Sequence, residues 1–326
     1  MRAVVCKQFG PPRGLVLEEV PSPRVKPGHV LIEVHAAGVN FPDVLVIQDK
    51  YQFKPPLPFT PGGEVAGVVK ELGEGTTGFA RGDRVLASTG WGGFAEEIAC
   101  DATRVFAIPA EMDFPDASAF LMTHGTSHYA LKDRAAIRPG ETLAVLGAAG
   151  GVGLAAVELG KLMGARVIAC ASSDEKLDVC RKHGADEGVN YAREDLKERL
   201  KVLTGGQGVD VVYDPVGGPF SEPALRSMAW EGRFLVIGFA AGEIPRPPLN
   251  LALLKGCSIV GVFWGAFTGR EPERNRANIA ELMRWYVEGK IRPYVSATYP
   301  LEEAASALEA MERREVKGKV VVTTGR

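Results

Sequence analysis

The small residues at positions 147–153, Gly-Ala-Ala-Gly-Gly-Val-Gly, have the spacing needed to bind a phosphate group. They match the dinucleotide fingerprint G-x-G-x-x-G, except that Ala148 stands at its first glycine. Gly147 and Gly150 permit a tight turn, and Gly153 permits close packing of a helix on a strand. The first turn of that helix would offer free N–H groups to an anion. We therefore expect a nicotinamide dinucleotide here, although a tight glycine turn in a sheet would give the same pattern.

The strand expected next along the chain ends in Ser172-Ser173, where NAD-binding folds carry an acid for the ribose 2′-hydroxyl. Without an acid a 2′-phosphate is not repelled, and serine hydroxyls can donate hydrogen bonds to it. Lys176 could add a cation and Tyr191 could come from the following loop, so the sequence favours NADP(H) over NAD(H). Alternatively, Ser172 only caps the helix and Lys176 is solvated. Asp174, in the first turn, is expected to stabilise the helix dipole.

The segments that would position these residues fall into two kinds. Ten of the 22 prolines lie before residue 62, among short alternating segments such as 30–34 and 64–69, which indicates a β-rich domain. From about residue 116, helices alternate with short apolar strands, the pattern of a doubly wound parallel sheet. We expect strands at 142–146, 166–171, 209–213, 233–237 and 258–263, with a weak one near Val189. We expect helices at 116–131 (with a break near Gly125), 153–163, 174–183, 194–203 and 220–230.

After Phe263 the pattern predicts a helix at 274–287, a strand near Val295, a helix at 301–313 and a closing strand at 320–323. We expect this tail to fold back onto the first domain. The expected domains are residues 1–120 (catalytic), 121–265 (nucleotide-binding) and 266–326 (the return to the first).

Composition excludes several classes of function. The net charge of −2 gives no basic surface for nucleic acid, and no apolar run reaches the length of a membrane span. The first residues lack the apolar core of a secretory signal, so we expect a cytoplasmic protein. The five cysteines form no C-x-x-C pair and are expected to be buried thiols: Cys6, Cys100, Cys170, Cys180 and Cys257.

Nearly the whole chain resembles the zinc-independent quinone oxidoreductases of the medium-chain dehydrogenase/reductase superfamily. The segments that carry the resemblance are 37–43, 61–67, 125–127, 148–153, 171–176 and 214–218. The resemblance implies a GroES-like β-rich catalytic domain, a Rossmann nucleotide-binding domain inserted into it, and a C-terminal return.

Zinc-dependent relatives use a cysteine, a Gly-His-Glu segment and a later cysteine or aspartate. At the first two places this chain has Asn40 and Gly62-Gly63-Glu64, so the thiolate and the imidazole of a catalytic zinc site are missing. The four closely spaced cysteines of the structural zinc lobe are missing too. His124 and His128 are four residues apart and could share a metal, but nothing suggests a third ligand, so we expect packing or hydrogen bonding and no metal.

The resemblance also implies which residues contact the cofactor and the acceptor. As catalytic residues we expect Asn40, Asp43, Tyr51 and Thr126. Asn40 and Asp43 could equally brace their loop, and Tyr51 could donate a proton, which solvent could also do. The expected cofactor contacts are Asn40, Phe41, Thr126, Ala149, Gly150, Gly151, Val152, Ser172, Ser173, Lys176, Tyr191, Gly217, Phe239, Ala240, Ala241, Phe263, Trp264 and Gly265.

Without a Lewis acid, a site of this kind suits hydride delivery to an acceptor that is already electrophilic. The first expectation is therefore NADPH-dependent reduction of a quinone. The alternatives are reduction of an enone, acrylate or acyl thioester, and a non-catalytic NADPH-binding protein. In the usual strand order the strand at 258–263 lies at the sheet edge, and its apolar, uncharged sequence predicts a homodimer paired through it.

Overall fold

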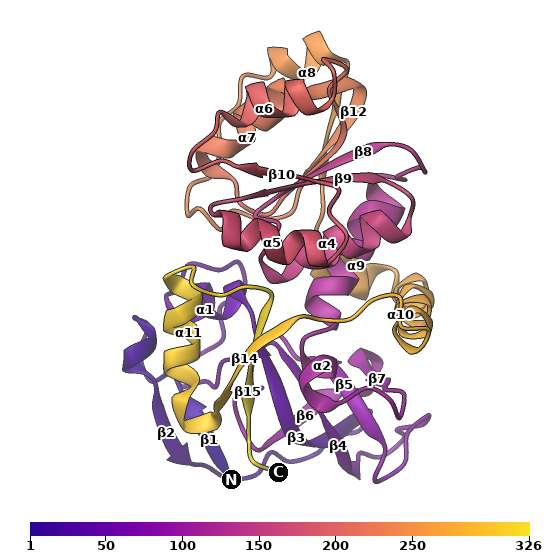
Figure 1. The fold of residues 1–326 in the computed structure, drawn as a ribbon. Coiled ribbons are helices and arrows are strands. Elements are labelled where there is room, and N and C mark those ends of the chain that lie inside the picture. Colours follow the sequence, from indigo (N-terminus) through magenta and orange to yellow (C-terminus); the bar gives the residue numbers. More distant parts are fainter. The chain divides into compact units, whose positions relative to one another are not determined.

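The computed structural model describes all residues from 1 to 326, and the chain divides into two compact units (Figure 1). Unit 1 comprises Met1–Met122 and Met283–Arg326, and unit 2 comprises Thr123–Leu282, so the second unit is inserted into the first. The second boundary lies inside helix α10 (Pro272–Val287) rather than near residue 266. Helix α9 (Trp264–Arg270) belongs to unit 2, where the Phe267 ring stacks on Tyr129 with centroids 4.1 Å apart.

Unit 2 contains a six-stranded sheet in the order β10-β9-β8-β11-β12-β13, and all neighbouring strands are parallel. The strands are β8 (Thr142–Leu146), β9 (Arg166–Ala171), β10 (Glu187–Asn190), β11 (Val209–Asp214), β12 (Met228–Val236) and β13 (Ser258–Gly261). Helices α4 (Gly151–Leu162) and α5 (Asp174–Lys182) cover one face. The other is covered by α6 (Leu196–Leu203), α7 (Ser221–Arg226) and α8 (Asn250–Lys255), as Figure 1 shows. The predicted doubly wound sheet is confirmed.

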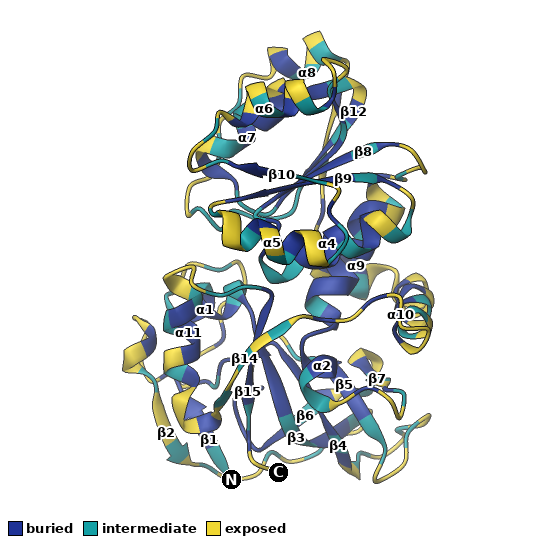
Figure 2. Ribbon diagram, in the orientation of Figure 1, coloured by how far each residue is buried: buried dark blue, intermediate teal, exposed yellow.

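The central strands are mostly apolar because both faces of the sheet are covered by helices. Strand β8 is buried at Leu143, Ala144, Val145 and Leu146, and the same holds for most of β9 and β11. Figure 2 shows the dark blue of buried residues along the strands labelled β8 and β9. The predicted helix at 220–230 is wrong at its end. Helix α7 stops at Arg226, and β12 begins at Met228 because this segment pairs with β11 instead of continuing the helix.

The segment predicted as one broken helix at 116–131 is also more complex. It contains α2 (Phe114–Ser118) and then a helical stretch from Leu121 to Arg134, in which the short α3 (Thr126–His128) lies between two wide π-helical turns. The helices α1 (Phe41–Ile47), α8 and α9 were not predicted. They are six or seven residues long, too short to show a clear helical period.

Unit 1 is built on a seven-stranded sheet in the order β14-β15-β3-β4-β5-β7, with β6 paired to β3, and a separate two-stranded ladder of β1 and β2. Its strands are β1 (Arg2–Val5), β2 (Val16–Glu19), β3 (His29–Val39), β4 (Glu64–Leu72), β5 (Arg84–Ser88), β6 (Glu97–Asp101), β7 (Val105–Ala107), β14 (Val295–Pro300) and β15 (Lys319–Thr323). Strand β15 runs antiparallel to β3, and helix α11 (Ala304–Glu312) contributes Ala304, Ala307 and Leu308 to the same core. The C-terminal residues Met283–Arg326 therefore belong to unit 1. None of the helices combines the length and apolar character needed to cross a membrane.

Candidate functional site

The turn between β8 and α4 has the geometry that the glycine pattern predicts. Gly147 adopts φ +57°, and Gly150 is the N-cap of α4, which therefore has no hydrogen bond from a capping side chain. A Cβ atom added to Gly153 would meet the carbonyl oxygen of Gly147 and lie 2.8 Å from Ala148 Cα. The helix therefore packs directly on the turn. Because Gly150 has no side chain, the first N–H groups of α4 are not capped by it. This cradle fits the pyrophosphate of a dinucleotide.

The predicted cofactor residues of unit 2 share one position in the topology. Since all six strands are parallel, their carboxyl ends meet at one edge of the sheet, which is where ligands bind in such folds. The structure brings these residues together at or just after the strand ends: Ala149, Gly150, Gly151 and Val152 after β8, Ser172, Ser173 and Lys176 after β9, and Tyr191 after β10. In the same way Gly217 follows β11, Phe239, Ala240 and Ala241 follow β12, and Phe263, Trp264 and Gly265 follow β13.

The loops after β11 and β12 are fixed to each other by backbone hydrogen bonds. Ala240 N donates to the Pro215 carbonyl at 3.0 Å, and Ala241 N donates to the Val216 carbonyl at 2.7 Å. Asp214, at the end of β11, accepts hydrogen bonds from Ser221 Oγ at 2.6 Å and from Gly217 N at 2.8 Å. Burial raises the pKa of Asp214 above its ordinary value. This carboxyl group therefore braces the loop rather than facing a ligand.

The end of β9 has the polar character expected of a 2′-phosphate site. Lys176 Nζ lies 3.3 Å from Ser172 Oγ, and Ser173 Oγ accepts a hydrogen bond from Lys176 N, so Ser173 caps α5. The carboxylate of Asp174 is held by Asn190 Nδ2 at 2.7 Å and by Arg193 Nη1 at 3.0 Å. Because the Arg193 guanidinium pairs with Asp174, it partly offsets the negative charge of the Asp174 carboxylate, which follows the two serines in the chain.

The two histidines that could have shared a metal contact different carboxylates instead. His124 Nε2 lies 3.3 Å from Glu158 Oε2, whereas His128 Nε2 lies 2.9 Å from Glu281 Oε2. Glu158 also contacts His183 Nδ1 at 2.9 Å. Burial lowers the pKa of His128, so the neutral ring is favoured. These contacts match the expectation of hydrogen bonding for His124 and His128.

Near the start of α1, unit 1 holds a buried network of polar side chains. Asn40 is 6% exposed, Asp43 3%, Glu64 0% and Lys319 3%. Lys319 Nζ donates to Asn40 Oδ1 at 2.6 Å and lies 3.3 Å from Glu64 Oε2. Asn40 Nδ2 donates to Glu64 Oε2 at 3.2 Å, and Glu64 Oε1 accepts from Met122 N at 2.9 Å. The network therefore joins the end of β3, the start of β4 and the start of β15.

Asp43 braces the turn at residues 40–43 through the backbone. Its Oδ2 accepts from Asn40 N at 2.7 Å, and its Oδ1 accepts from Gly63 N at 3.1 Å. Burial raises the pKa of Asp43 to about 7, and the negative charge of Glu64 adds to this effect. The bracing role that the sequence left open for Asp43 is thus present in the structure, while a catalytic role stays a prediction.

Tyr51 packs half-buried against the core of unit 1, and its ring centroid lies 6.0 Å from that of Phe53. Burial and the nearby charge of Asp43 raise the pKa of Tyr51, so its hydroxyl is protonated at neutral pH.

Phe41 begins α1, directly after Asn40. Thr126 lies in unit 2 as the first residue of α3 and is 9% exposed. Their contacts with a cofactor or an acceptor stay predictions.

The residues at the zinc positions of the dehydrogenase relatives do not fit a metal ion. Asn40 and Gly63 offer neither a thiolate nor an imidazole, and the ammonium group of Lys319 lies against Asn40 and Glu64. No group of three His, Cys, Asp or Glu side chains is arranged to hold a metal ion. A lysine cation in this position would repel a divalent cation.

Sequence reasoning missed Lys319, Asn190 and Arg193. The sequence did contain a sign of the role of Lys319, because this residue is a single charge at the start of the apolar strand β15. A lysine is seldom buried without a partner. Its partners lie more than 250 positions away along the chain, so the pairing could not be read from the sequence. Arg193 stands among several charged residues and carried no signal of its own.

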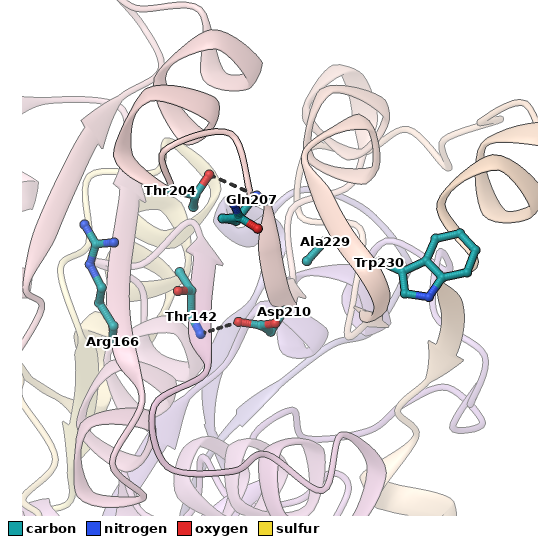
Figure 3. A pocket seen from close by; sticks show the side chains of 8 residues that line it. Thr142, Arg166, Thr204, Gln207, Asp210, Ala229 and Trp230 are labelled. Atoms are coloured by element: carbon teal, nitrogen blue, oxygen red, sulfur yellow. Dashed lines mark hydrogen bonds between the residues drawn. The ribbon is translucent and has the colours of Figure 1, made fainter.

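A cavity of about 350 Å³ lies elsewhere in unit 2. Figure 3 shows the side chains that line it. Its walls include Thr142 and Arg166, the first residues of β8 and β9, together with Asp210 and Trp230. Asp210 Oδ2 accepts a hydrogen bond from Thr142 N at 2.7 Å, so this carboxylate is already used in holding the strands together (Figure 3). The cavity lies at the amino ends of the strands and is no part of the predicted nucleotide site.

Comparisons with known proteins agree with this geometry. The family described as alcohol dehydrogenase GroES-like domain matches residues 26–110, and the family described as zinc-binding dehydrogenase matches residues 151–286. The chain is 40% identical to quinone oxidoreductase-like protein 2 of Bos taurus over 99% of this chain and 92% of that protein. It is 33% identical to quinone oxidoreductase of Rattus norvegicus over 99% of this chain and 97% of that protein.

Solved structures show the same likeness. Escherichia coli quinone oxidoreductase, solved in complex with NADPH, superposes with a TM-score of 0.92 at 29% identity, covering 99% of this chain and 100% of that chain. A mycobacterial protein, also solved with NADPH, gives a TM-score of 0.93 at 31% identity over 99% of both chains. The two-unit fold, the glycine cradle and the missing zinc ligands therefore lead to one conclusion: the chain belongs to the zinc-independent quinone oxidoreductase family of the medium-chain dehydrogenase/reductase superfamily.

Proposed function

We propose that this protein is an enzyme that transfers a hydride from NADPH to a quinone or a similar conjugated acceptor. The observation that carries the proposal is the glycine cradle after β8 together with Ser172, Ser173 and Lys176 after β9. The NADPH complexes of two structurally similar proteins support the choice of cofactor. Family members named quinone oxidoreductase support the choice of acceptor.

NADPH, when bound, supplies the hydride. The residues of the chain bind and orient the reactants. The N–H groups at the start of α4 would hold the pyrophosphate, and Ser172 and Lys176 would bind the 2′-phosphate. As the family resemblance implies, we assign the nicotinamide contacts to the turn at 40–43 and to Thr126. The protonated hydroxyl of Tyr51 can donate a hydrogen bond to an acceptor oxygen, where negative charge develops.

The first prediction concerns metal dependence and acceptor class. Protein treated with a chelator should keep its NADPH-dependent activity on a benzoquinone or naphthoquinone, because no step requires a Lewis acid. Activity on isolated ketones and saturated alcohols should be at least about a hundredfold lower, since an unactivated carbonyl needs several kcal/mol of charge stabilisation that a metal would supply. Elemental analysis should find well under one zinc per chain.

The same assay should include an enone, an acrylate and an acyl thioester as acceptors. Turnover of one of these without turnover of quinones would leave hydride transfer in place and change the acceptor. Stoichiometric zinc whose removal abolishes turnover would overturn the mechanism. NADPH binding without turnover of any acceptor would favour a non-catalytic binding protein.

We further propose that two copies of the chain pair through β13. The structure has this strand at the edge of the sheet of unit 2, as predicted. Ile259 in β13 is 41% exposed, and neighbouring segments expose Leu253, Leu254 and Phe263. An apolar edge without charges is a template for pairing, and an antiparallel two-fold contact would continue the sheet through both copies.

The second prediction tests this edge. Ile259→Lys should convert a dimer into a monomer, because a charge at the edge opposes pairing with a second copy. Leu17→Lys is a matched control, since Leu17 is also 41% exposed but lies in β2 of unit 1. Light scattering at micromolar concentration should give a dimer mass for the unchanged protein and for Leu17→Lys only. A monomer mass for the unchanged protein would contradict the proposal.

A further inference from the structure

We propose that Lys319 is a positioning residue for hydride transfer, and that its buried ammonium group holds the turn at residues 40–43 in place. This inference rests on the proposed function. Lys319 Nζ lies 2.6 Å from Asn40 Oδ1, 3.0 Å from the Val39 carbonyl oxygen and 3.3 Å from Glu64 Oε2. An ammonium group has three N–H donors, and these three acceptors use all of them.

The contacts of Lys319 determine how the Asn40 amide is turned. Because Asn40 Oδ1 accepts from the ammonium group, Nδ2 faces the other way and donates to Glu64 Oε2 and to the Gly38 carbonyl, each at 3.2 Å. An apolar residue at position 319 would leave Oδ1 without this donor, and the amide could turn over. The backbone N–H of Asn40 is bonded to Asp43, so the effect would reach the whole turn.

A purely structural role explains these contacts less well. Two buried charges are costly to desolvate, and apolar side chains of similar volume often stabilise a fold as well or better. Here the pair of Lys319 and Glu64 also bonds Asn40, and Glu64 bonds the backbone of Met122, the last residue of unit 1 before unit 2 begins. The ion pair of Lys319 and Glu64 thus fixes the turn at residues 40–43, which the family resemblance assigns to the nicotinamide.

Lys319 also acts on the charge of Asp43. The charged or titratable groups that face Asp43 are Lys319, Glu64 and Tyr51. Burial raises the pKa of Asp43 to about 7, while the charge of Lys319 works against this rise. Removal of the ammonium group should therefore raise the pKa of Asp43 further, and any pH-dependent step that needs its charged form should shift to higher pH.

The experiment compares four variants: Lys319→Met, Lys319→Arg, the double variant Glu64→Gln with Lys319→Met, and Lys70→Met. The double variant removes both charges of the Lys319–Glu64 ion pair, yet the amide introduced at position 64 can draw Asn40 Oδ1 toward it. Lys70→Met is the matched control, because Lys70 pairs with Glu97 at 2.5 Å in the same unit but is 44% exposed. The readouts are NADPH oxidation with a naphthoquinone across pH and the titration of carboxyl groups by carbon-13 NMR.

We expect the double variant to melt near the unchanged protein and to lose about tenfold or more in kcat, the effect of one misplaced charge-assisted hydrogen bond. Its Kd for NADPH should change by less than about twofold, because the pyrophosphate cradle lies in unit 2. Lys319→Met should raise the pKa of Asp43, Lys319→Arg should recover part of kcat, and Lys70→Met should match the unchanged protein.

A double variant with the kcat and pH profile of the unchanged protein would overturn the proposal. So would a Lys319→Arg variant as impaired as Lys319→Met, and this comparison holds even if the double variant does not fold. If the unchanged protein reduces no acceptor, the proposed function fails. The NMR titration of Asp43 in Lys319→Met still decides whether Lys319 controls this turn, since it needs no substrate.

Discussion

Valine in place of Gly153 is expected to weaken NADPH binding by at least about a hundredfold and to lower the stability of unit 2. The added Cβ would lie 2.8 Å from Ala148 Cα and 2.9 Å from the Ala148 carbonyl carbon, both backbone atoms that no rotamer change can move. Forcing extra volume into such a contact costs about 1–3 kcal/mol and shifts the backbone. Because α4 begins at this turn, the shift also displaces the N–H groups that would bind the pyrophosphate.

Titration of NADPH fluorescence should show a Kd at least about a hundredfold higher for Gly153→Val. Two other glycines give matched controls. Gly269→Ala in α9 should change neither binding nor stability, because nothing lies within 4 Å of the added Cβ. Gly150→Ala should fold, since its added Cβ lies 3.4 Å from its nearest neighbour, but should weaken binding because it crowds the N-cap. Unchanged affinity in Gly153→Val would rule out the cradle as the pyrophosphate site.

The fold of unit 2 could be predicted because its strands are short apolar runs between glycine turns and amphipathic helices. The predicted bounds of β8 and β9 match the structure residue for residue. The helix predicted to end at Trp230 is wrong for a physical reason. The local sequence there is compatible with a helix, but the pairing of β12 with β11 determines the structure. A contact between distant segments cannot be seen in a local pattern.

The candidate site also has a part that could be predicted from the sequence and a part that could not. Residues after the strand ends of unit 2 could be predicted, because the glycine spacing and the topology place them at one edge of the sheet. In unit 1 the sequence pointed to Asn40 and Asp43, but the charges that surround them come from the start of β4 and from β15. The ion pair of Asp174 with Arg193 was missed for a similar reason, because it joins α5 to the loop after β10.

A change of cofactor preference is expected when Ser172→Asp is combined with Lys176→Ala. The unchanged protein should prefer NADPH, because Lys176 and Ser172 lie 3.3 Å apart at the end of β9 and can bind the 2′-phosphate together. Removing the lysine loses a charge-assisted hydrogen bond of about 1.5–3 kcal/mol, or about one to two decades in affinity. The new carboxylate repels the 2′-phosphate and can accept a hydrogen bond from the 2′-hydroxyl of NADH.

The ratio of kcat/KM for NADPH over NADH should therefore fall by about a thousandfold in the double variant, with most of the change in KM. Lys182→Ala is the matched control, because Lys182 is an exposed lysine at the other end of the same helix α5. The structure shows that Ser173, not Ser172, caps α5. If Lys176 were merely solvated, both lysine variants would weaken NADPH binding equally little. A response confined to Lys176 would instead place the 2′-phosphate at the start of α5, where Arg193 partly offsets the charge of Asp174.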